Sequence, residues 1–185
     1  MLFRSGVLSI EHPNGRPRTV IDVGGQDTKV IALGEDGEVE DFSMNDKCAA
    51  GTGRFLEVLA SKLGLSYAEF VEIAREPAEE IMLNSTCAVF AESEVVGLLA
   101  RNVSKSGISA AAHDSIATRV ASMVRRVGRI GPYCFVGGGA GNEALVRAVS
   151  ENLNAPVSVP PDHQLVIALG AAVEARRKYG KSSVV

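Results

Sequence analysis

Residues 20–53 read VIDVGGQDTKVIALGEDGEVEDFSMNDKCAAGTG, and this stretch sets the organisation of the chain. A short apolar strand reaches Asp22 and the glycine pair Gly24–Gly25, and strand-like runs follow. Cys48 then precedes a second glycine turn, Gly51–Gly53. Glycines at the end of a strand let main-chain N–H groups converge on an anion. The stretch therefore predicts a phosphate loop and a metal-binding thiol within one supersecondary unit.

The composition limits the class of protein. The chain has 185 residues, which suits one domain or one large lobe of a bigger protein. Hydrophobic residues make up 46% and charged residues 22%, enough for a packed core. The net charge of −3 and the lack of a long basic or apolar run predict no nucleic-acid partner and no membrane partner. Three scattered cysteines and no recognisable secretory signal favour a reducing, cytoplasmic location.

The order of the predicted elements indicates an α/β fold. Alternating or β-branched runs predict strands at 19–23, 28–33, 38–43, 133–136 and 156–159. Apolar periodicity and capping signals predict helices at 54–63, 67–75, 90–103, 107–127, 143–152 and 164–179. A three-strand meander, a helical middle and a closing β-turn-α-β-α together predict one mixed sheet with flanking helices.

A second glycine loop repeats the pattern of the first. The apolar strand at 133–136 runs directly into Gly137-Gly138-Gly139-Ala140-Gly141-Asn142. This loop leads into a helix, whose N-terminus favours an anion or a flat ligand laid across the backbone. In the first loop, Asp22 is placed to hold Mg²⁺ or its water, and Gln26 or Thr28 to reach a phosphate oxygen. Each loop alone also fits an ordinary turn, but the two together predict a nucleotide site.

Two cysteines occupy positions with a possible chemical role. Cys48 and Cys87 each stand just ahead of a predicted helix, whose N-terminus stabilises a thiolate. Thiolates are the ligands of iron–sulfur clusters, and two per chain would become four in a two-fold dimer. On the residues alone, both cysteines equally fit small buried apolar positions. Packing is the expected role of Cys134, inside a strand, and a surface or packing role is expected of His113, inside an alanine-rich helix.

Several segments resemble one known family. VIDVGGQDTKVI, MNDKCAAGTGRFLE, NSTCAVFAESEV, FVGGGAGN and PPDHQLVIALGAA are similar to the ATP-dependent activators of 2-hydroxyacyl-CoA dehydratases. The same family includes the ATPase subunits of benzoyl-CoA reductase. The likeness runs from Thr19 to Arg177 and implies a ribonuclease-H-like lobe of the acetate-kinase/Hsp70/actin superfamily. It also implies a homodimer that carries one [4Fe-4S] cluster, with Cys48 and Cys87 of each subunit as its ligands.

The resemblance implies a function as well. Activators of this family take an electron from ferredoxin or flavodoxin. They couple ATP binding and hydrolysis to its transfer to the dehydratase or reductase. Carried onto this sequence, Asp22 and Gln26 are the expected catalytic residues for MgATP. The expected nucleotide-binding residues are Gly24, Gly25, Gln26, Thr28, Gly137, Gly138, Gly139 and Gln164.

The resemblance has one gap. Members of the family begin with a first lobe that carries another Asp-x-Gly phosphate loop, and residues 1–18 do not resemble it. We therefore expect an irregular lead-in at 1–18, an ATPase lobe with the cluster helices at 19–180, and a tail at 181–185. Two other interpretations stay open. One is a sugar- or acid-kinase-like phosphotransferase lobe whose cysteines only pack, and the other is a non-catalytic, nucleotide-binding regulatory lobe.

Overall fold

The structure is a computed structural model that describes residues 15–45, 51–83, 88–128 and 131–179. Cys48 and Cys87, the predicted cluster ligands, lie outside these residues. The strands are β1 (Thr19–Val23), β2 (Thr28–Leu33), β3 (Val39–Asn45), β4 (Tyr133–Val136) and β5 (Val157–Ser158). The helices are α2 (Gly53–Lys62), α3 (Tyr67–Ile73), α4 (Ala88–Ala100), α5 (Lys105–Arg126), the 3₁₀ helix η2 (Gly138–Gly141), α6 (Glu143–Leu153) and α7 (Val166–Tyr179).

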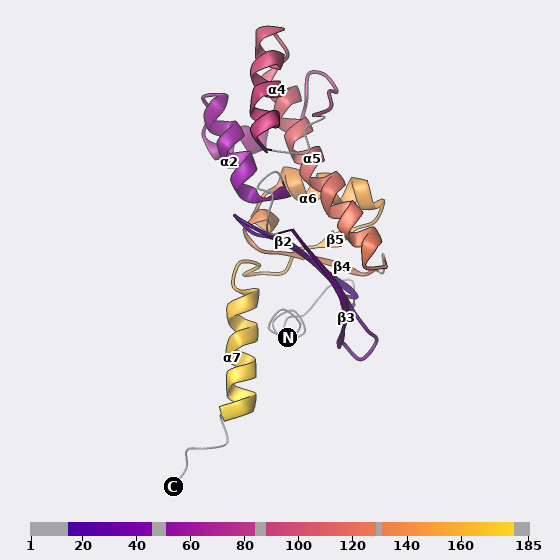
Figure 1. The fold of residues 1–185 in the computed structure, drawn as a ribbon. Coiled ribbons are helices and arrows are strands. Elements are labelled where there is room, and N and C mark those ends of the chain that lie inside the picture. Colours follow the sequence, from indigo (N-terminus) through magenta and orange to yellow (C-terminus); the bar gives the residue numbers. More distant parts are fainter. Residues whose placement is uncertain (1–14, 46–50, 84–87, 129–130, 180–185) are drawn as a thin grey trace.

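The predicted mixed sheet is confirmed, with the strand order β3-β2-β1-β4-β5 (Figure 1). β1, β2 and β3 form the antiparallel meander, whereas β4 runs parallel to β1 and β5 parallel to β4. Asp22 pairs in register with Val136, so β1 and β4 end side by side. Each glycine loop follows the C-terminal end of one of these parallel strands, so both loops lie at the same end of the sheet.

The element boundaries differ from the prediction at a few ends. β3 extends to Asn45, and β5 is limited to Val157–Ser158. α4 begins at Ala88, directly after the position of Cys87, and α7 begins at Val166 instead of Gln164. The capping box of Ser66 with Glu69 is present and starts α3 as expected.

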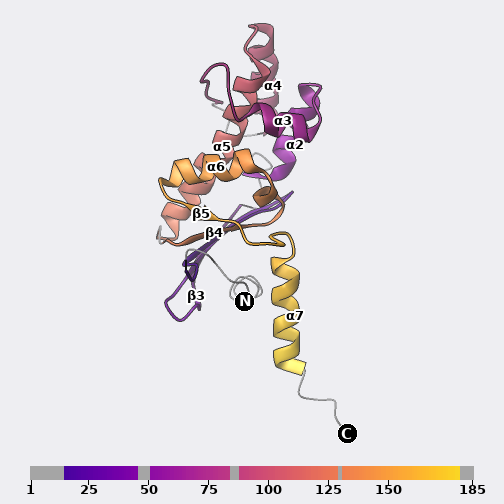
Figure 2. The same cartoon turned by 180° about the vertical axis from the view of Figure 1, so that it is seen from behind.

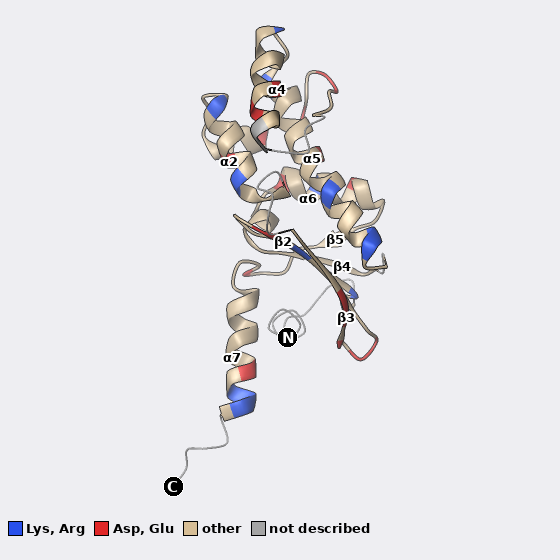
Figure 3. Cartoon of the chain, in the orientation of Figure 1, with Lys and Arg blue, Asp and Glu red and all other residues tan. Residues whose placement is uncertain are grey.

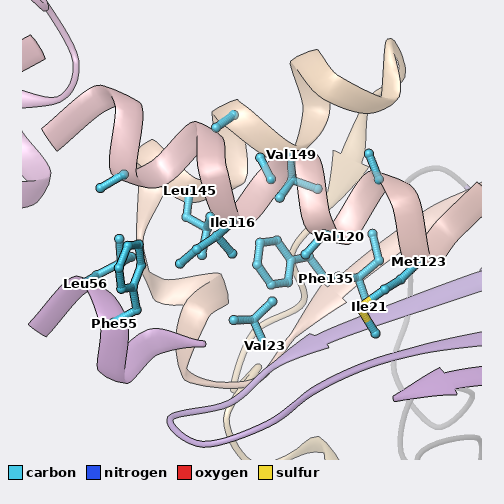
Figure 4. Close-up of a cluster of buried hydrophobic side chains, with 14 of the residues drawn as sticks. Ile21, Val23, Phe55, Leu56, Ile116, Val120, Met123, Phe135, Leu145 and Val149 are labelled. Atoms are coloured by element: carbon cyan, nitrogen blue, oxygen red, sulfur yellow. The ribbon is translucent and has the colours of Figure 1, made fainter. Parts of the chain in front are cut away.

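One face of the sheet forms the main core. Ile21, Val23 and Phe135 project from β1 and β4 toward Ile116 and Val120 of α5, and all are buried (Figure 4). Helices α2 and α6 complete the same cluster with Phe55, Leu56, Leu145 and Val149. Each such side chain contributes roughly 1.5–3 kcal/mol when fully buried. The core therefore ties the helical segment between β3 and β4 to the two strands that carry the glycine loops.

The opposite face of the sheet has a smaller cluster, in which Val166 at the start of α7 packs with Val20, Ile31 and Val136. From there α7 extends away from the sheet in both views (Figures 1 and 2). Basic residues gather in its last turn, where they complement the helix dipole (Figure 3). None of the helices in the described part of the chain is long and apolar enough to cross a membrane.

Candidate nucleotide-binding site

The two glycine loops touch each other beside Asp22. Gly137 has a φ of +84°, and a Cβ there would overlap Oδ1 of Asp22 and lie 2.8 Å from the Val23 carbonyl oxygen. A Cβ at Gly139 would lie 2.8 Å from the Cβ of Val23. Side chains at these two positions would force the loops apart. The glycines are therefore needed to bring the ends of β1 and β4 into contact.

Other glycines of the two loops face open space. Gly25 and Gly138 are exposed, and a Cβ built at either would have no atom of the described residues within 4 Å. Bare backbone at the ends of two neighbouring strands lets a ligand approach the main-chain N–H groups closely. The two loops thus have the form expected of a site for phosphates and a nucleoside.

Asp22 is a buried carboxylate at the meeting point of the loops. It is 3% exposed, and burial raises its pKa to about 6, while Lys29 acts against this rise and Asp27 adds to it. The Lys29 ammonium lies 3.8 Å from the Asp22 carboxylate and 2.6 Å from that of Asp27. A desolvated carboxylate near open backbone is a suitable oxygen ligand for Mg²⁺ or for a metal-bound water.

The first loop is a tight turn between β1 and β2. The Gly24 amide donates to the Asp27 carbonyl at 2.9 Å, which closes the turn and leaves Gln26 exposed at its tip. Thr28 is buried, and its hydroxyl donates to the carbonyl of Gly51 at 2.5 Å. The Thr28 hydroxyl is thus directed at the second turn of the opening stretch, and its contact with phosphate stays a prediction.

The first loop also binds the start of α2. The amides of Gly53 and Arg54 donate to the carbonyls of Gly24 and Gly25, at 2.9 and 3.1 Å. The first N–H groups of a helix have no acceptor within the helix, so these carbonyls take that role. The sequence carried no signal for this contact, because the four groups that form it belong to the backbone.

His163 holds the second loop through two hydrogen bonds to Gly137. Its carbonyl accepts the Gly137 amide at 2.9 Å, and its ring Nδ1 lies 2.8 Å from the Gly137 carbonyl, to which it donates. The turn that contains His163 therefore holds the predicted residue Gln164, exposed, next to the glycine loop. The only sequence signal for His163 is its place within the PPDHQ segment, and no role is predicted from it.

Asn142 ends the second loop and begins α6. It is 2% exposed, and its Oδ1 accepts the Leu145 amide at 2.9 Å as a helix cap. Its Nδ2 donates to the Tyr67 hydroxyl at 2.9 Å and lies 3.0 Å from Nε2 of His113. His113 is buried, as expected for a packing residue, and its Nδ1 lies 2.7 Å from the Ser109 carbonyl. α3, α5 and α6 thus meet behind the glycine loop.

The electrostatics of His113 fit this network. Burial lowers the pKa of its ring to about 4, while the hydrogen bond to the Ser109 carbonyl acts in the opposite direction. In the neutral ring, Nδ1 donates to the Ser109 carbonyl and Nε2 accepts from Asn142. All polar atoms of the Asn142 side chain then have partners, which fixes the amide's orientation.

Comparison with known proteins identifies the family. The sequence matches the BadF/BadG/BcrA/BcrD ATPase family over residues 7–175. The chain belongs to this family. Its sequence is 46% identical over 158 residues to the 2-hydroxyisocaproyl-CoA dehydratase activator of Clostridioides difficile, covering 85% of this chain and 59% of that protein. The chain thus spans about six tenths of the length of the curated relatives it matches.

Two solved structures have the same fold as this chain. The activator of the 2-hydroxyisocaproyl-CoA dehydratase from Clostridium difficile with bound ADPNP gives a TM-score of 0.88 at 41% identity, covering 100% of this chain and 69% of that chain. Component A of the Acidaminococcus fermentans (R)-2-hydroxyglutaryl-CoA dehydratase gives 0.89 at 39% identity, covering 97% and 68%. The predicted ribonuclease-H-like lobe of the actin and Hsp70 superfamily is confirmed.

The structure describes the predicted nucleotide site but not the predicted cluster ligands. The predicted nucleotide residues gather at the two loops, with Gln164 held in the adjoining turn. The proposed cluster ligands Cys48 and Cys87 are outside the described residues, so their fit to a cluster stays a prediction. Among the described residues, no group of three or more His, Cys, Asp or Glu could hold a metal ion.

Proposed function

We propose that this chain binds ATP or ADP with Mg²⁺ and acts in an ATP-dependent activator that passes an electron to a 2-hydroxyacyl-CoA dehydratase. A benzoyl-CoA reductase component is the alternative acceptor. One observation carries the proposal: two glycine loops with open backbone meet at a buried Asp22, in a chain of this ATPase family. The names of the relatives supply the class of partner.

The proposed nucleotide lies across both loops. The phosphates lie against the turn formed by Gly24 and Gly25, with exposed Gly25 as the closest backbone, and Asp22 holds the Mg²⁺ or one of its waters. Gln26, exposed at the tip of the turn, orients the attacking water during hydrolysis. The nucleoside lies on Gly137–Gly139, and Gln164 borders it. The burial of Asp22 supports its role, because Mg²⁺ would stabilise the ionised form that burial disfavours.

The proposed electron carrier is a [4Fe-4S] cluster that a homodimer shares, with Cys48 and Cys87 of both subunits as its ligands. The cluster would supply one-electron transfer, and ferredoxin or flavodoxin would reduce it in the cytoplasm. α4 begins at Ala88, the residue after Cys87, and α2 begins at Gly53, shortly after Cys48. The start of a helix favours a thiolate, which supports both assignments.

The proposed coupling uses the backbone bonds between the first loop and α2. The carbonyls of Gly24 and Gly25 accept the first amides of α2. A change of the loop between the ATP and ADP states would therefore act on the start of α2, which follows Cys48 in the chain. Nucleotide free energy can bias an electron carrier in this way only if the two states bind nucleotide with different affinity.

The test begins with purification without oxygen and reconstitution with iron and sulfide. We expect a brown protein with about four irons per dimer, as a four-thiolate cluster requires. Replacing Cys48 and Cys87 together with alanine should abolish the colour and the iron. Cys134→Ala is the matched control, since Cys134 is buried in β4 and burial raises its pKa to about 12. Its iron content should be unchanged.

Functional readouts follow from the reconstituted protein. MgADP binding is measured by calorimetry, and ATP-dependent activation of a purified 2-hydroxyacyl-CoA dehydratase is measured with reduced ferredoxin or flavodoxin as donor. A protein that stays colourless after reconstitution but binds MgADP would contradict the electron-transfer proposal and favour the phosphotransferase-like lobe. A brown protein that binds no nucleotide would contradict the ATP-dependent part.

A further inference from the structure

Tyr67, at the first position of α3, stands beside the end of the second glycine loop. Its hydroxyl accepts a hydrogen bond from Nδ2 of Asn142, the residue that directly follows η2. Asn142 itself donates its amide to the carbonyl of Gly139 within the loop. The Tyr67 side chain is thus connected to the loop through one buried residue. Even so, 40% of Tyr67 remains exposed.

The surroundings of Tyr67 place it on the side of α2. α3, which Tyr67 begins, packs against α2. Burial raises the pKa of the Tyr67 hydroxyl, the bond to Asn142 lowers it, and Glu57 of α2 adds a smaller rise. Glu57 lies one helical turn after Gly53, the residue that is bonded to the first glycine loop. Tyr67 therefore lies between the helix that the first loop holds and the residue that ends the second loop.

Asn142 connects Tyr67 to a buried polar network. Oδ1 of Asn142 caps α6, and its Nδ2 donates to Tyr67 and to Nε2 of His113. His113 in turn stacks on Phe70 with a ring separation of 5.4 Å. Phe70 follows Tyr67 by three residues on the same face of α3 and is fully buried. The inner part of this face is therefore locked in the core, and Tyr67 is its exposed end.

We propose that the Tyr67 ring forms a wall of the pocket for the nucleotide's base and contacts the base by stacking. This inference rests on the proposed nucleotide function and adds a residue that determines its selectivity for a base. On the proposed path the phosphates lie at Gly25, the sugar crosses Gly138, and the base continues toward Asn142 after η2, to which Tyr67 is bonded. An aromatic ring held there by a buried partner loses little freedom on binding, so stacking contributes to affinity with little offset.

The experiment compares a probe with a base to a probe without one. MgADP and magnesium pyrophosphate are titrated by calorimetry into the 185-residue chain and into Tyr67→Leu. We expect Tyr67→Leu to weaken MgADP binding by about 5- to 100-fold, the range for loss of one stacked base. Pyrophosphate affinity should change by less than about 2-fold, because it does not reach the ring.

Tyr67→Phe keeps the ring and removes the hydroxyl, so its MgADP affinity should fall by less than about 5-fold. Tyr179→Leu is the control, since Tyr179 is an exposed residue at the end of α7. Its affinity for both probes should match that of the unchanged chain. Thermal unfolding without ligand establishes that each variant is folded before it is titrated.

Fluorescence supplies a second readout. The chain has no tryptophan and three tyrosines, so its emission comes from tyrosine. A base stacked on Tyr67 should quench part of this emission in the unchanged chain and in Tyr179→Leu, but not in Tyr67→Phe. Pyrophosphate should quench none of it.

Two results would overturn the inference. MgADP affinity of Tyr67→Leu within 2-fold of the unchanged chain would exclude a contact with the base. An equal loss of affinity for MgADP and pyrophosphate would assign Tyr67 to positioning the loops instead. If the unchanged chain binds neither probe, the nucleotide function itself fails, and this outcome differs from the other two.

Discussion

The backbone amide of Gly53 donates to the carbonyl of Gly24 at a distance of 2.9 Å. One residue belongs to the turn after β1, and the other begins α2, so the bond joins the candidate phosphate loop to a helix start. A second backbone bond, from the Arg54 amide to the Gly25 carbonyl, lies next to it. A rigid contact of this kind can carry a small displacement of the loop into the whole helix, because packed elements move as units.

Thr28 makes a side-chain bond to Gly51, two residues before Gly53, and this bond can be tested by substitution. Thr28→Val keeps the shape of the side chain but removes the hydroxyl that donates to the Gly51 carbonyl at 2.5 Å. Gly51 is buried, so its carbonyl would be left without this donor. We expect the free energy of unfolding in urea to fall by about 1–3 kcal/mol. Thr118→Val, which removes an exposed hydroxyl bonded to Asn152, should change it by less than about 0.5 kcal/mol.

The same variant separates two roles of Thr28. If the hydroxyl contacts phosphate, as the sequence analysis predicts, Thr28→Val should weaken MgADP binding beyond what its loss of stability explains. If the hydroxyl acts through Gly51, MgADP binding at a temperature where the variant is fully folded should stay within about 3-fold of the original. Calorimetry at two temperatures distinguishes these results.

Two glycines of the second loop should differ strongly in how much stability they lose on substitution by alanine. Gly137→Ala adds a Cβ that overlaps Asp22, at a φ of +84°, and should reduce the free energy of unfolding by about 3 kcal/mol or more. Gly138→Ala adds a Cβ that meets open space and should change it by less than about 1 kcal/mol, in either direction.

Gly138→Ala should impair nucleotide binding although it leaves stability almost unchanged. A methyl group there enters the space where we propose the nucleoside lies, so Gly138→Ala should weaken MgADP binding while the protein stays stable. Urea unfolding and calorimetry on the same preparations check both parts. An alanine at Gly137 that is tolerated without loss of stability would contradict the close contact of the two loops.

Secondary-structure elements are predicted from the sequence more closely than contacts between distant backbone groups. Strands β1, β2 and β4 were predicted at their observed bounds, because β-branched runs that end in glycine carry both signals in the sequence itself. The capping box at Ser66 was also found, since its two residues stand at a fixed spacing. The contact of Gly24 with Gly53 could not be derived. It joins backbone groups far apart in the chain, and such groups have no residue-specific signal.

The role of Asn142 was missed for a related reason. Its place between a glycine loop and a helix identifies a cap, but its partners Tyr67 and His113 belong to helices whose packing the pattern does not determine. A histidine in an alanine-rich helix is most simply explained as a packing residue. That prediction is confirmed for His113, which is 1% exposed, but it omits the polar network that the ring completes.

Asp22→Asn should stabilise the ligand-free protein at neutral pH. Burial raises the pKa of Asp22 to about 6, above its ordinary value of 3.8, so the folded state binds the proton more tightly than the unfolded chain does. The stability that this proton contributes is complete below pH 3.8 and is lost as the pH rises through about 6. At pH 7.5 the ionised carboxylate therefore costs on the order of 3 kcal/mol, which asparagine avoids.

The measurement is urea unfolding of both proteins from pH 4 to pH 8. The advantage of Asp22→Asn should shrink as the pH falls toward 4, where the carboxyl of the unchanged protein is protonated. Saturating MgADP should raise the stability of the unchanged protein at pH 7.5 more than that of Asp22→Asn, because the neutral amide oxygen of asparagine binds Mg²⁺ more weakly than an ionised carboxylate does. If the asparagine variant is less stable at every pH, the prediction is wrong. The attraction between Lys29 and the Asp22 carboxylate would then outweigh the cost of burying that carboxylate.

His113 should produce the opposite dependence on pH. Burial lowers its pKa to about 4, below its ordinary value of 6.5, so the unfolded chain binds the proton more tightly than the folded state does. The stability that follows from the neutral ring is complete above pH 6.5 and is lost as the pH falls through about 4. The full loss is on the order of 3 kcal/mol. A protonated ring would also turn an N–H toward the Nδ2 donor of Asn142, which opens the junction behind the glycine loop.

The Asp22→Asn background isolates this effect, because Asp22 changes stability with the reverse sign over much of the same pH range. On that background the free energy of unfolding should decline between pH 6.5 and pH 4. Adding His113→Gln should flatten the decline, since glutamine retains a donor and an acceptor without titrating. NMR of the His113 ring gives its pKa directly. A ring that titrates near 6.5 in the folded protein would contradict both its burial and its bond to Asn142.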